Sequence, residues 1–305
     1  MSVRVGLPRG LLYFHYGLLW ESFLQYLGAE VVVSGETSQA TLNFGNTLDE
    51  VCLPVKAYFG HVYQMRHDVD CLFVPRIISV ANRQYTCPKI IGVPDMLRSN
   101  IPELPQLLDV NVSLYKHRHQ LYQAIISLGE KLGKGPLESL WAWYRACRRY
   151  KSGLNANDML VKYQPEQTTK KIGLIGHPYI VYDHQLSMNV LKKLQEMRIY
   201  VITADMVADH RADAAAGFLE KKIFWSFCHR LAGAALALLQ PPETVDGLIL
   251  ITSFCCGPDS LVVELIKQQA RCAGVPCMLL MIDEHTAEAG IVTRLEAFVD
   301  LLGRG

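Results

Sequence analysis

Short apolar segments alternate with helical periodicity in both halves of the chain, and this alternation constrains the fold more than any other feature. Runs rich in Val, Ile and Leu are bounded by turn residues, and segments with apolar positions three and four apart follow them. The expected strands are 3–7, 30–33, 70–74, 171–175, 200–203, 247–252 and 277–282. Strands that alternate with helices at this spacing form mostly parallel sheets, so we expect an α/β fold.

Two domains are expected in the chain. Its 305 residues exceed the length of about 150 that a typical domain has. A polar stretch at 155–169, which carries Pro165, separates the two alternating halves. We therefore expect an N-terminal α/β domain at 1–165, extended by two helices within 114–153, and a C-terminal α/β domain at 166–305.

The composition narrows the class of protein. Charged side chains make up 19% of the residues, below the roughly 25% of average proteins, which favours strands buried on both faces. The net charge of +1 gives no support to a nucleic-acid partner or an anionic membrane. No apolar run reaches the roughly 20 residues of a membrane span, and no leader opens the chain. We expect a cytoplasmic protein without membrane contact.

Chemically unusual residues follow the expected strands. They occupy 8–10, 75–76, 176–179, 253–260 and 283–286. Ligands of open parallel sheets bind beyond the carboxyl ends of the strands, so these turns are the expected binding edge. His177, Glu284 and His285 are the acid–base candidates there. The alternative is that the histidines are hydrogen-bonded loop residues and that the glutamate caps the last helix.

Nine cysteines are an odd number in an expected reducing compartment, so a disulfide framework is not expected. Cys71 and Cys277 lie on apolar strands and Cys147 on a helix, where a small core residue is the better interpretation. Cys272 and Cys277 belong to different elements and make a weak metal motif. Cys228, within an apolar helix, is ambiguous.

Three other cysteines share a local pattern. Cys52, Cys87 and Cys256 each have a proline within the next two residues, and the other six do not. Proline suits the first turn of a helix, so a helix is expected to begin just after Cys52 and Cys256. Helix N-termini favour the thiolate, which is the form that binds iron or attacks electrophiles.

The spacing of these thiols helps to choose among metal sites. A structural zinc site would show close C-x2-C pairs, whereas an iron–sulfur cluster tolerates scattered ligands and usually takes four. Cys255 is a candidate fourth ligand, and a fourth iron open to water or substrate is the alternative. Three unrelated loop cysteines remain the competing interpretation. Arg9, Lys56, Arg76 and Lys89 suit either neutralisation of an anionic group or solvated surface charge.

Known nucleotide and hydrolase motifs are missing from the sequence. It contains no phosphate-binding G-x-x-x-x-G-K-[ST], no dinucleotide G-x-G-x-x-G, no G-x-S-x-G elbow and no H-E-x-x-H. The motifs therefore give no basis for predicting a P-loop enzyme, a Rossmann-fingerprint dehydrogenase, a serine hydrolase or a zinc protease.

Several longer segments carry a family resemblance. They read GLPRGLLYFHYGLLW, DEVCLPVKAYFGHV, IGHPYIVYD, SFCCGPDSLVVELI and IDEHTAEAGIVTRLEAFVD. These segments resemble the acyl-CoA dehydratase activase-related (CoA-protein activase) family, over most of the chain except its central helical stretch. That family is related to the iron–sulfur subunits of 2-hydroxyacyl-CoA dehydratases and to double-cubane cluster proteins. The resemblance implies two flavodoxin-like or Rossmann-like domains with a cluster between them.

The resemblance also implies a ligand set and partners. Cys52, Cys87 and Cys256 match the family's cysteines, whereas the position of Cys255 is commonly glycine, which makes it an optional ligand. The implied cofactor is a [4Fe–4S] cluster, with a double-cubane [8Fe–9S] cluster as the alternative. The implied partner is an ATP-dependent activator or another electron donor. The activator's own ATP-binding domain has no match in this chain.

The leading hypothesis is an iron–sulfur protein of anaerobic metabolism. Its role would be low-potential electron transfer, or reductive chemistry on a small substrate as a reductase or dehydratase-like component. A non-catalytic binding or scaffold module for a CoA thioester or a partner protein is the alternative. A third hypothesis is a thiol enzyme with Cys256 as nucleophile. Assembly as a homodimer is left open.

Overall fold

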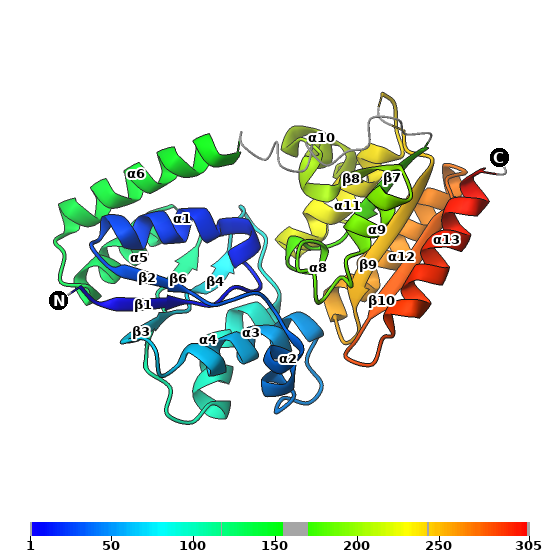
Figure 1. Ribbon diagram of the computed structural model, residues 1–305. Coiled ribbons are helices and arrows are strands. Elements are labelled where there is room, and N and C mark those ends of the chain that lie inside the picture. Colours follow the sequence, from blue (N-terminus) through cyan, green and yellow to red (C-terminus); the bar gives the residue numbers. More distant parts are fainter. Residues whose placement is uncertain (1, 117, 155–169, 243, 304–305) are drawn as a thin grey trace. The chain divides into compact units, whose positions relative to one another are not determined.

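The computed structural model describes residues 2–116, 118–154, 170–242 and 244–303. The described residues divide into two compact units. The first contains 2–49 and 55–154, and the second contains 50–54 and 170–303. The boundary expected between 165 and 166 lies outside the described residues. Each unit is an α/β structure in its own right (Figure 1).

The first unit is built on a parallel four-stranded sheet in the order β2-β1-β3-β5. Its strands are β1 (Arg4–Leu7), β2 (Glu30–Val33), β3 (Cys71–Phe73) and β5 (Gln106–Leu108). A second, two-stranded parallel sheet joins β4 (Arg76–Ser79) to β6 (Asn111–Ser113). Val5, Leu72 and Leu108 in the larger sheet are almost fully buried, as expected for strands covered on both faces.

Six described helices surround these strands: α1 (Tyr13–Tyr26), α2 (Gln39–Gly45), α3 (Leu53–Met65), α4 (Pro88–Asn100), α5 (His119–Lys131) and α6 (Pro136–Leu154). Helices α1, α5 and α6 share one apolar core with the sheet, in which Phe23 and Trp143 meet edge to face at 5.2 Å (Figure 1). Helices α2 and α3 approach so closely that a Cβ at Gly60 would overlap the carbonyl oxygen of Thr41, so only glycine fits at this position.

The second unit has its own parallel four-stranded sheet, in the order β10-β9-β7-β8. Its strands are β7 (Lys170–Ile175), β8 (Ile199–Thr203), β9 (Gly247–Ser253) and β10 (Cys277–Ile282). Every residue of β9 is buried, which fits a central strand with neighbours on both edges and helices on both faces.

The helices of the second unit are α8 (Pro178–Val181), α9 (Val190–Glu196), the 3-10 turn Ala204–Met206, α10 (Asp209–Ala216), α11 (Ser226–Leu238), α12 (Gly257–Cys272) and α13 (Glu288–Gly303). Helices α10, α11 and α12 contribute to one apolar core. Helix α13 packs elsewhere on the sheet, where Phe298 and Leu302 lie against Gly247. Figure 1 shows α9 and α13 on the side of the sheet opposite α11.

Both large sheets share one strand order. Numbered along the chain within each unit, the four strands lie in the order 2-1-3-4. This is the beginning of the flavodoxin-like order, so the predicted flavodoxin-like or Rossmann-like α/β fold is confirmed. The strand order reverses between β1 and β3 in the first unit, and between β7 and β9 in the second. Ligands of such sheets bind at the carboxyl ends of these two strand pairs.

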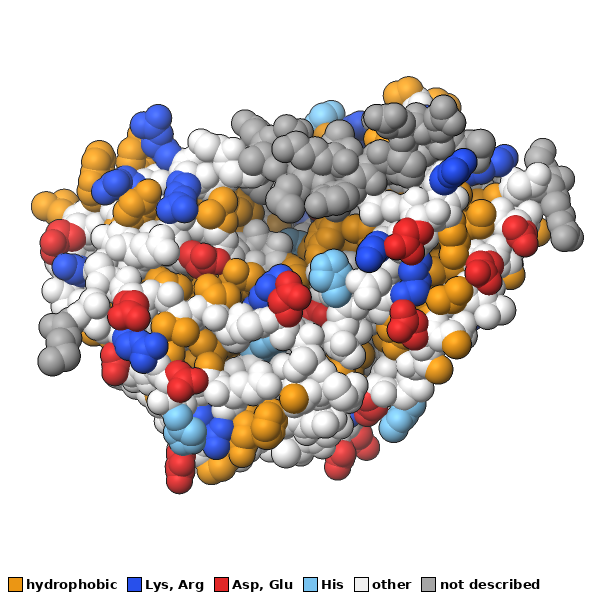
Figure 2. Space-filling view, in the orientation of Figure 1, with side chains coloured by type: hydrophobic (Ala, Val, Ile, Leu, Met, Phe, Trp, Pro, Cys, Tyr) orange, Lys and Arg blue, Asp and Glu red, His pale blue; other side chains and the backbone are white. Residues whose placement is uncertain are grey.

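The surface matches the balanced charge of the sequence. Lys and Arg side chains are interspersed with Asp and Glu over the face in Figure 2, and neither sign dominates it. None of the helices in the described residues is long and apolar enough to cross a membrane.

Candidate functional site

The chemically richest part of the described chain lies at the strand reversal of the second unit. His177 follows β7 and precedes α8, while the 253–256 turn follows β9 and leads into α12. Strands β7 and β9 are hydrogen-bonded neighbours, with Ile175 opposite Leu250. Gly176 permits this approach, because a Cβ there would collide with Ile251. The structure therefore brings two of the predicted ligand-edge turns together.

The turn after β9 positions Cys256. Cys255 adopts a left-handed conformation with φ of 61°, and the amide of Cys256 donates to the carbonyl of Ser253 at 3.2 Å. Cys256 then occupies the N-cap of α12, with Pro258 in the first turn of that helix. Cys255 is exposed and Cys256 is partly buried. The helix predicted to begin just after Cys256 is present.

Cys52 belongs to the same unit as Cys256. Residues 50–54 cluster with the second unit, and the amide of Leu53 donates to Ser253 Oγ at 3.0 Å. Helix α3 begins at Leu53, directly after the partly buried Cys52, as the sequence predicted. Two of the three predicted ligands thus lie on segments that are tied together by a hydrogen bond, although 200 residues separate its two partners.

The pKa of Tyr179 depends on several acidic groups of this site. Burial raises the pKa of its phenol well above the usual value, and negative charge on Asp259, Cys256, Cys52 and Cys228 raises it further. The Tyr179 ring also stacks on His177, with centroids 4.8 Å apart and planes 15° from parallel. Four acidic groups from three separate stretches of chain therefore act on the pKa of this phenol.

Asp259 is the centre of a buried hydrogen-bond network. Its Oδ1 lies 2.9 Å from His177 Nε2 and accepts from Cys228 Sγ at 3.4 Å, while its Oδ2 accepts from Thr252 Oγ1 at 3.0 Å. Burial alone would raise the pKa of Asp259, but the charge and hydrogen bond of His177, with the other two donors, lower it to about 2. A buried carboxylate is thus held ionised by three partners.

The bonding capacity of this network is not exhausted. His177 Nδ1 is buried and, among the described residues, has no hydrogen-bond partner. Atoms of His177, Cys228 and Asp259 that can bind a metal all lie within 4.8 Å of one another. Asp259 and Cys228 sit in the first turns of α12 and α11, where the helix dipole stabilises negative charge.

Sequence reasoning missed most of this network. It placed Asp259 on the binding edge without a role, left Cys228 undecided and gave Thr252 no function. One signal was present: an acidic residue in the first turn of a helix that follows a largely apolar strand. Such a residue normally caps its own helix, and only the fold shows that Asp259 turns inward.

The third predicted ligand lies in the first unit. Cys87 is the N-cap of α4 and Pro88 occupies the first turn, so the same cysteine-before-helix arrangement occurs here too. Its thiol is partly buried. The prediction that a cluster lies between the two domains stays a prediction.

Glu284 and His285 stand apart from His177. Both are exposed in the turn after β10, and β9 separates β10 from β7 in the sheet. The carboxylate of Asp283 organises this turn by accepting from the His285 amide at 3.0 Å and from Thr286 Oγ1 at 2.7 Å. The structure thus places two acid–base candidates at the surface and buries the third.

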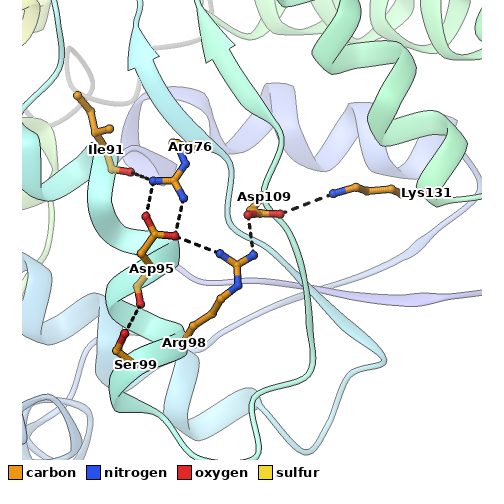
Figure 3. Close-up of polar contacts among 7 residues, drawn as sticks. All are labelled: Arg76, Ile91, Asp95, Arg98, Ser99, Asp109 and Lys131. Carbon is orange, nitrogen blue, oxygen red and sulfur yellow. Dashed lines mark hydrogen bonds and ion pairs between the residues drawn. The ribbon is translucent and has the colours of Figure 1, made fainter.

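Arg76 is engaged in an ion-pair network of the first unit (Figure 3). Its guanidinium donates to both carboxylate oxygens of Asp95 at 2.7 Å and to the carbonyl of Ile91 at 2.9 Å. Arg98 bridges Asp95 to Asp109. Arg76 is the first residue of β4 rather than part of a turn, and its charge is committed to Asp95.

Of the four remaining cysteines, three have thiol pKa values raised by burial and one is exposed. Burial raises the pKa of Cys71 to about 11, and burial likewise raises the pKa of Cys277 to about 11. Burial also raises the pKa of Cys147. Cys272 is exposed at the end of α12. None of these four belongs to the cluster of groups around Tyr179.

Comparison with known protein families identifies the chain's relatives. Residues 4–207, about two thirds of the chain, match the family described as CoA enzyme activase uncharacterised domain (DUF2229). No curated protein matches the chain. The chain therefore belongs to this CoA enzyme activase-related family, which supports a relation to the 2-hydroxyacyl-CoA dehydratase system.

Proposed function

We propose that this protein binds an iron–sulfur cluster of the [4Fe–4S] type through Cys52, Cys87 and Cys256, and that it takes part in low-potential electron transfer or in reductive chemistry on a small substrate. The observation that carries the proposal is the convergence of Cys52 and Cys256 in one unit. Each thiol directly precedes a helix, and the Leu53–Ser253 hydrogen bond ties their segments together.

The residues present fit such a cofactor. Iron–sulfur clusters are held by thiolates, and helix N-termini favour that form. Cys52, Cys87 and Cys256 are all partly buried, and the adjoining helices fix their backbones. Cys255, exposed beside Cys256, is an optional fourth ligand. A double-cubane [8Fe–9S] cluster is the alternative cofactor.

The chain's own residues would perform the supporting chemistry. A bound cluster supplies one-electron transfer. Glu284 and His285, exposed after β10, are the groups able to exchange protons with solvent or substrate. His177 is buried against Asp259 and is better suited to a fixed bonding role than to exchange with solvent.

Family membership suggests how electrons would arrive. A CoA enzyme activase-related chain is expected to work beside an activator or a dehydratase component, so an ATP-dependent activator or another electron-donor protein is the proposed partner. The sequence has no P-loop motif, so the proposal assigns ATP binding to the partner.

Anaerobic purification followed by iron and sulfide analysis and EPR tests the proposal. The wild-type protein is expected to hold one cluster's worth of iron and sulfide, before or after reconstitution. Cys52→Ala, Cys87→Ala and Cys256→Ala should each lower the iron content and change the absorption and EPR spectra. Cys272→Ala, which removes an exposed thiol at the other end of α12, is the matched control and should change neither.

The alternative is a binding module that holds a CoA thioester or a partner protein without a cluster. In that case the three variants would keep the wild-type spectrum, and the reconstituted protein would contain less than one cluster's worth of iron. Rapid labelling of Cys256 alone by iodoacetamide, without metal loss, would instead indicate a thiol enzyme.

A further inference from the structure

The buried network around Asp259 has the composition of a metal site. Imidazole, thiolate and carboxylate are the three side-chain ligands of zinc, and His177, Cys228 and Asp259 supply one of each. Their side chains come from the end of β7 and the first turns of α11 and α12. Three distant stretches of chain therefore deliver three different ligand types to one place.

We propose that His177, Cys228 and Asp259 bind a single divalent transition ion of borderline softness, such as Zn²⁺, at a site distinct from the thiols of the proposed cluster. The proposal does not depend on the cluster, because it uses neither Cys52, Cys87 nor Cys256. Three protein ligands leave one coordination position for water or another small ligand, as in zinc sites that are not purely structural.

The distances are close to those that a tetrahedral ion requires. Metal–ligand bonds of about 2.0–2.3 Å place the ligand atoms of such an ion roughly 3.3–3.8 Å apart. The Cys228 Sγ–Asp259 Oδ1 distance is 3.4 Å, and the His177 Nε2–Asp259 Oδ1 distance is 2.9 Å. The third pair, His177 and Cys228, lies within 4.8 Å, so a small adjustment that exchanges the two hydrogen bonds for metal bonds would accommodate the ion.

The charge balance also favours a cation. Asp259 is ionised and only 4% exposed, so the network buries a carboxylate charge that a cation can balance. Binding of M²⁺ uses the lone pair of His177 Nε2 and leaves the ring proton on Nδ1. It also breaks the Cys228 S–H bond and forms the M–S bond, and the thiol proton leaves to solvent. The carboxylate and the thiolate then neutralise the ion, and burial of a neutral group costs less than burial of a net charge.

The two ring nitrogens of His177 fit different roles in such a site. Nε2 faces the carboxylate of Asp259, whereas Nδ1 has no hydrogen-bond partner among the described residues and is available to carry the ring proton while Nε2 binds the ion. Thr252 Oγ1 holds the other oxygen of Asp259 at 3.0 Å, which is the kind of supporting bond that fixes a ligating carboxylate. The arrangement thus combines three potential ligands with a supporting hydrogen bond to one of them.

Titration with Co²⁺ tests the site. Anaerobically purified protein, stripped with a chelator, should bind one Co²⁺ with a thiolate-to-cobalt charge-transfer band and tetrahedral visible bands, and Zn²⁺ should abolish both. The affinity should rise about tenfold per pH unit while the thiol is still protonated, because one proton is released. Absence of any thiolate band in the folded wild-type protein would overturn the proposal.

Variants separate this site from the cluster. Cys228→Ser should lose the charge-transfer band, and His177→Gln should weaken Co²⁺ binding at least about tenfold. Cys256→Ala and the control Cys272→Ala should keep the band. Loss of the band in Cys256→Ala but not in Cys228→Ser would place the ion on the cluster thiols and contradict the proposal.

A thermal measurement guards against misfolded variants. Zn²⁺ should raise the thermal midpoint of the wild-type protein and of Cys256→Ala, because it binds the folded state, and should leave that of Cys228→Ser unchanged. If the protein binds Co²⁺ at this site but no preparation contains iron, the proposed cluster is rejected and the metal site of His177, Cys228 and Asp259 is retained. If iron is bound through Cys52 and Cys256 but no Co²⁺ site is found, the cluster is retained and this inference is rejected.

Discussion

Two buried histidines, one in each unit, show how similar sheets support different chemistry. His61 on α3 is 1% exposed, and both of its ring nitrogens have neutral partners: Ser34 Oγ at 3.1 Å and Thr37 Oγ1 at 3.0 Å. His177 is 3% exposed, with Nε2 on the ionised Asp259 and Nδ1 without a partner among the described residues. Similar burial therefore accompanies two different bonding patterns.

The two histidines also lie in different electrostatic environments. Burial, with a contribution from the positive charge of Arg9, lowers the pKa of His61 to about 4, so this imidazole stays neutral at neutral pH. In the second unit a carboxylate with a pKa of about 2 supplies the charge, and the imidazole bonds to it. The first site thus holds a neutral imidazole among hydroxyl groups, whereas the second pairs an imidazole with a buried carboxylate and is the site proposed for a metal ion.

The largest effect is expected from removal of the buried carboxylate. Asp259→Ala leaves Thr252 Oγ1, Cys228 Sγ and His177 Nε2 without their acceptor, and should lower the free energy of unfolding by about 3–5 kcal/mol. Urea unfolding at pH 7 measures it. Asp95→Ala is the matched control, because its carboxylate also has several partners but is exposed, and its effect should be much smaller. Equal losses in the two variants would contradict the contrast between the sites.

The second prediction concerns how the contribution of His61 to the free energy of unfolding changes with pH. Because the folded-state pKa is about 4 and the ordinary value is 6.5, the unfolded chain binds the proton first as the pH falls. Neutral His61 makes its full contribution to the free energy of unfolding above pH 6.5. This contribution, about 3 kcal/mol, is lost as the pH falls from 6.5 to 4. His61→Gln cannot protonate, so its urea midpoint should change less over this window. If the urea midpoint of His61→Gln changed with pH as steeply as that of the wild-type protein, the lowered pKa would not belong to His61.

The smallest effect compares single hydroxyl groups. Thr252→Val removes a donor to an ionised carboxylate and should cost about 2 kcal/mol, whereas Ser34→Ala removes bonds to neutral groups and should cost about 1 kcal/mol. Both are measured by urea unfolding at pH 7. If Ser34→Ala proved the more costly of the two, the carboxylate would not be the dominant charge of the second site.

Sequence patterns predicted the elements whose apolar periodicity is strong. Strand β10 (Cys277–Ile282) was predicted at both ends, and Gly28 ends the first helix in a left-handed conformation with φ of 85°, as expected of a C-cap. Helix α4 was not predicted, because Pro94 lies inside it and its apolar periodicity is weak. Strands β5 and β6 have only three residues each, too few to show a period.

The candidate site was predictable only in its local part. A proline soon after Cys52 or Cys256 is a local signal for a helix start, and both helices are present. The partners of Asp259 are not local: they lie 82 residues away at His177 and 31 residues away at Cys228. Which side chains meet there depends on β7 and β9 being neighbours, which no short pattern in the sequence encodes.

The assignment of residues 50–54 to the second unit has a practical consequence for dissecting the protein. The chain enters the second unit at residue 50, leaves it after 54 and returns only after the long first unit is complete. A fragment that starts after residue 165 would contain His177, Cys228 and Cys256 but would lack Cys52 and the Leu53 amide that bonds Ser253. Neither unit can be obtained whole by a single cut, so the two halves of this protein are best studied together.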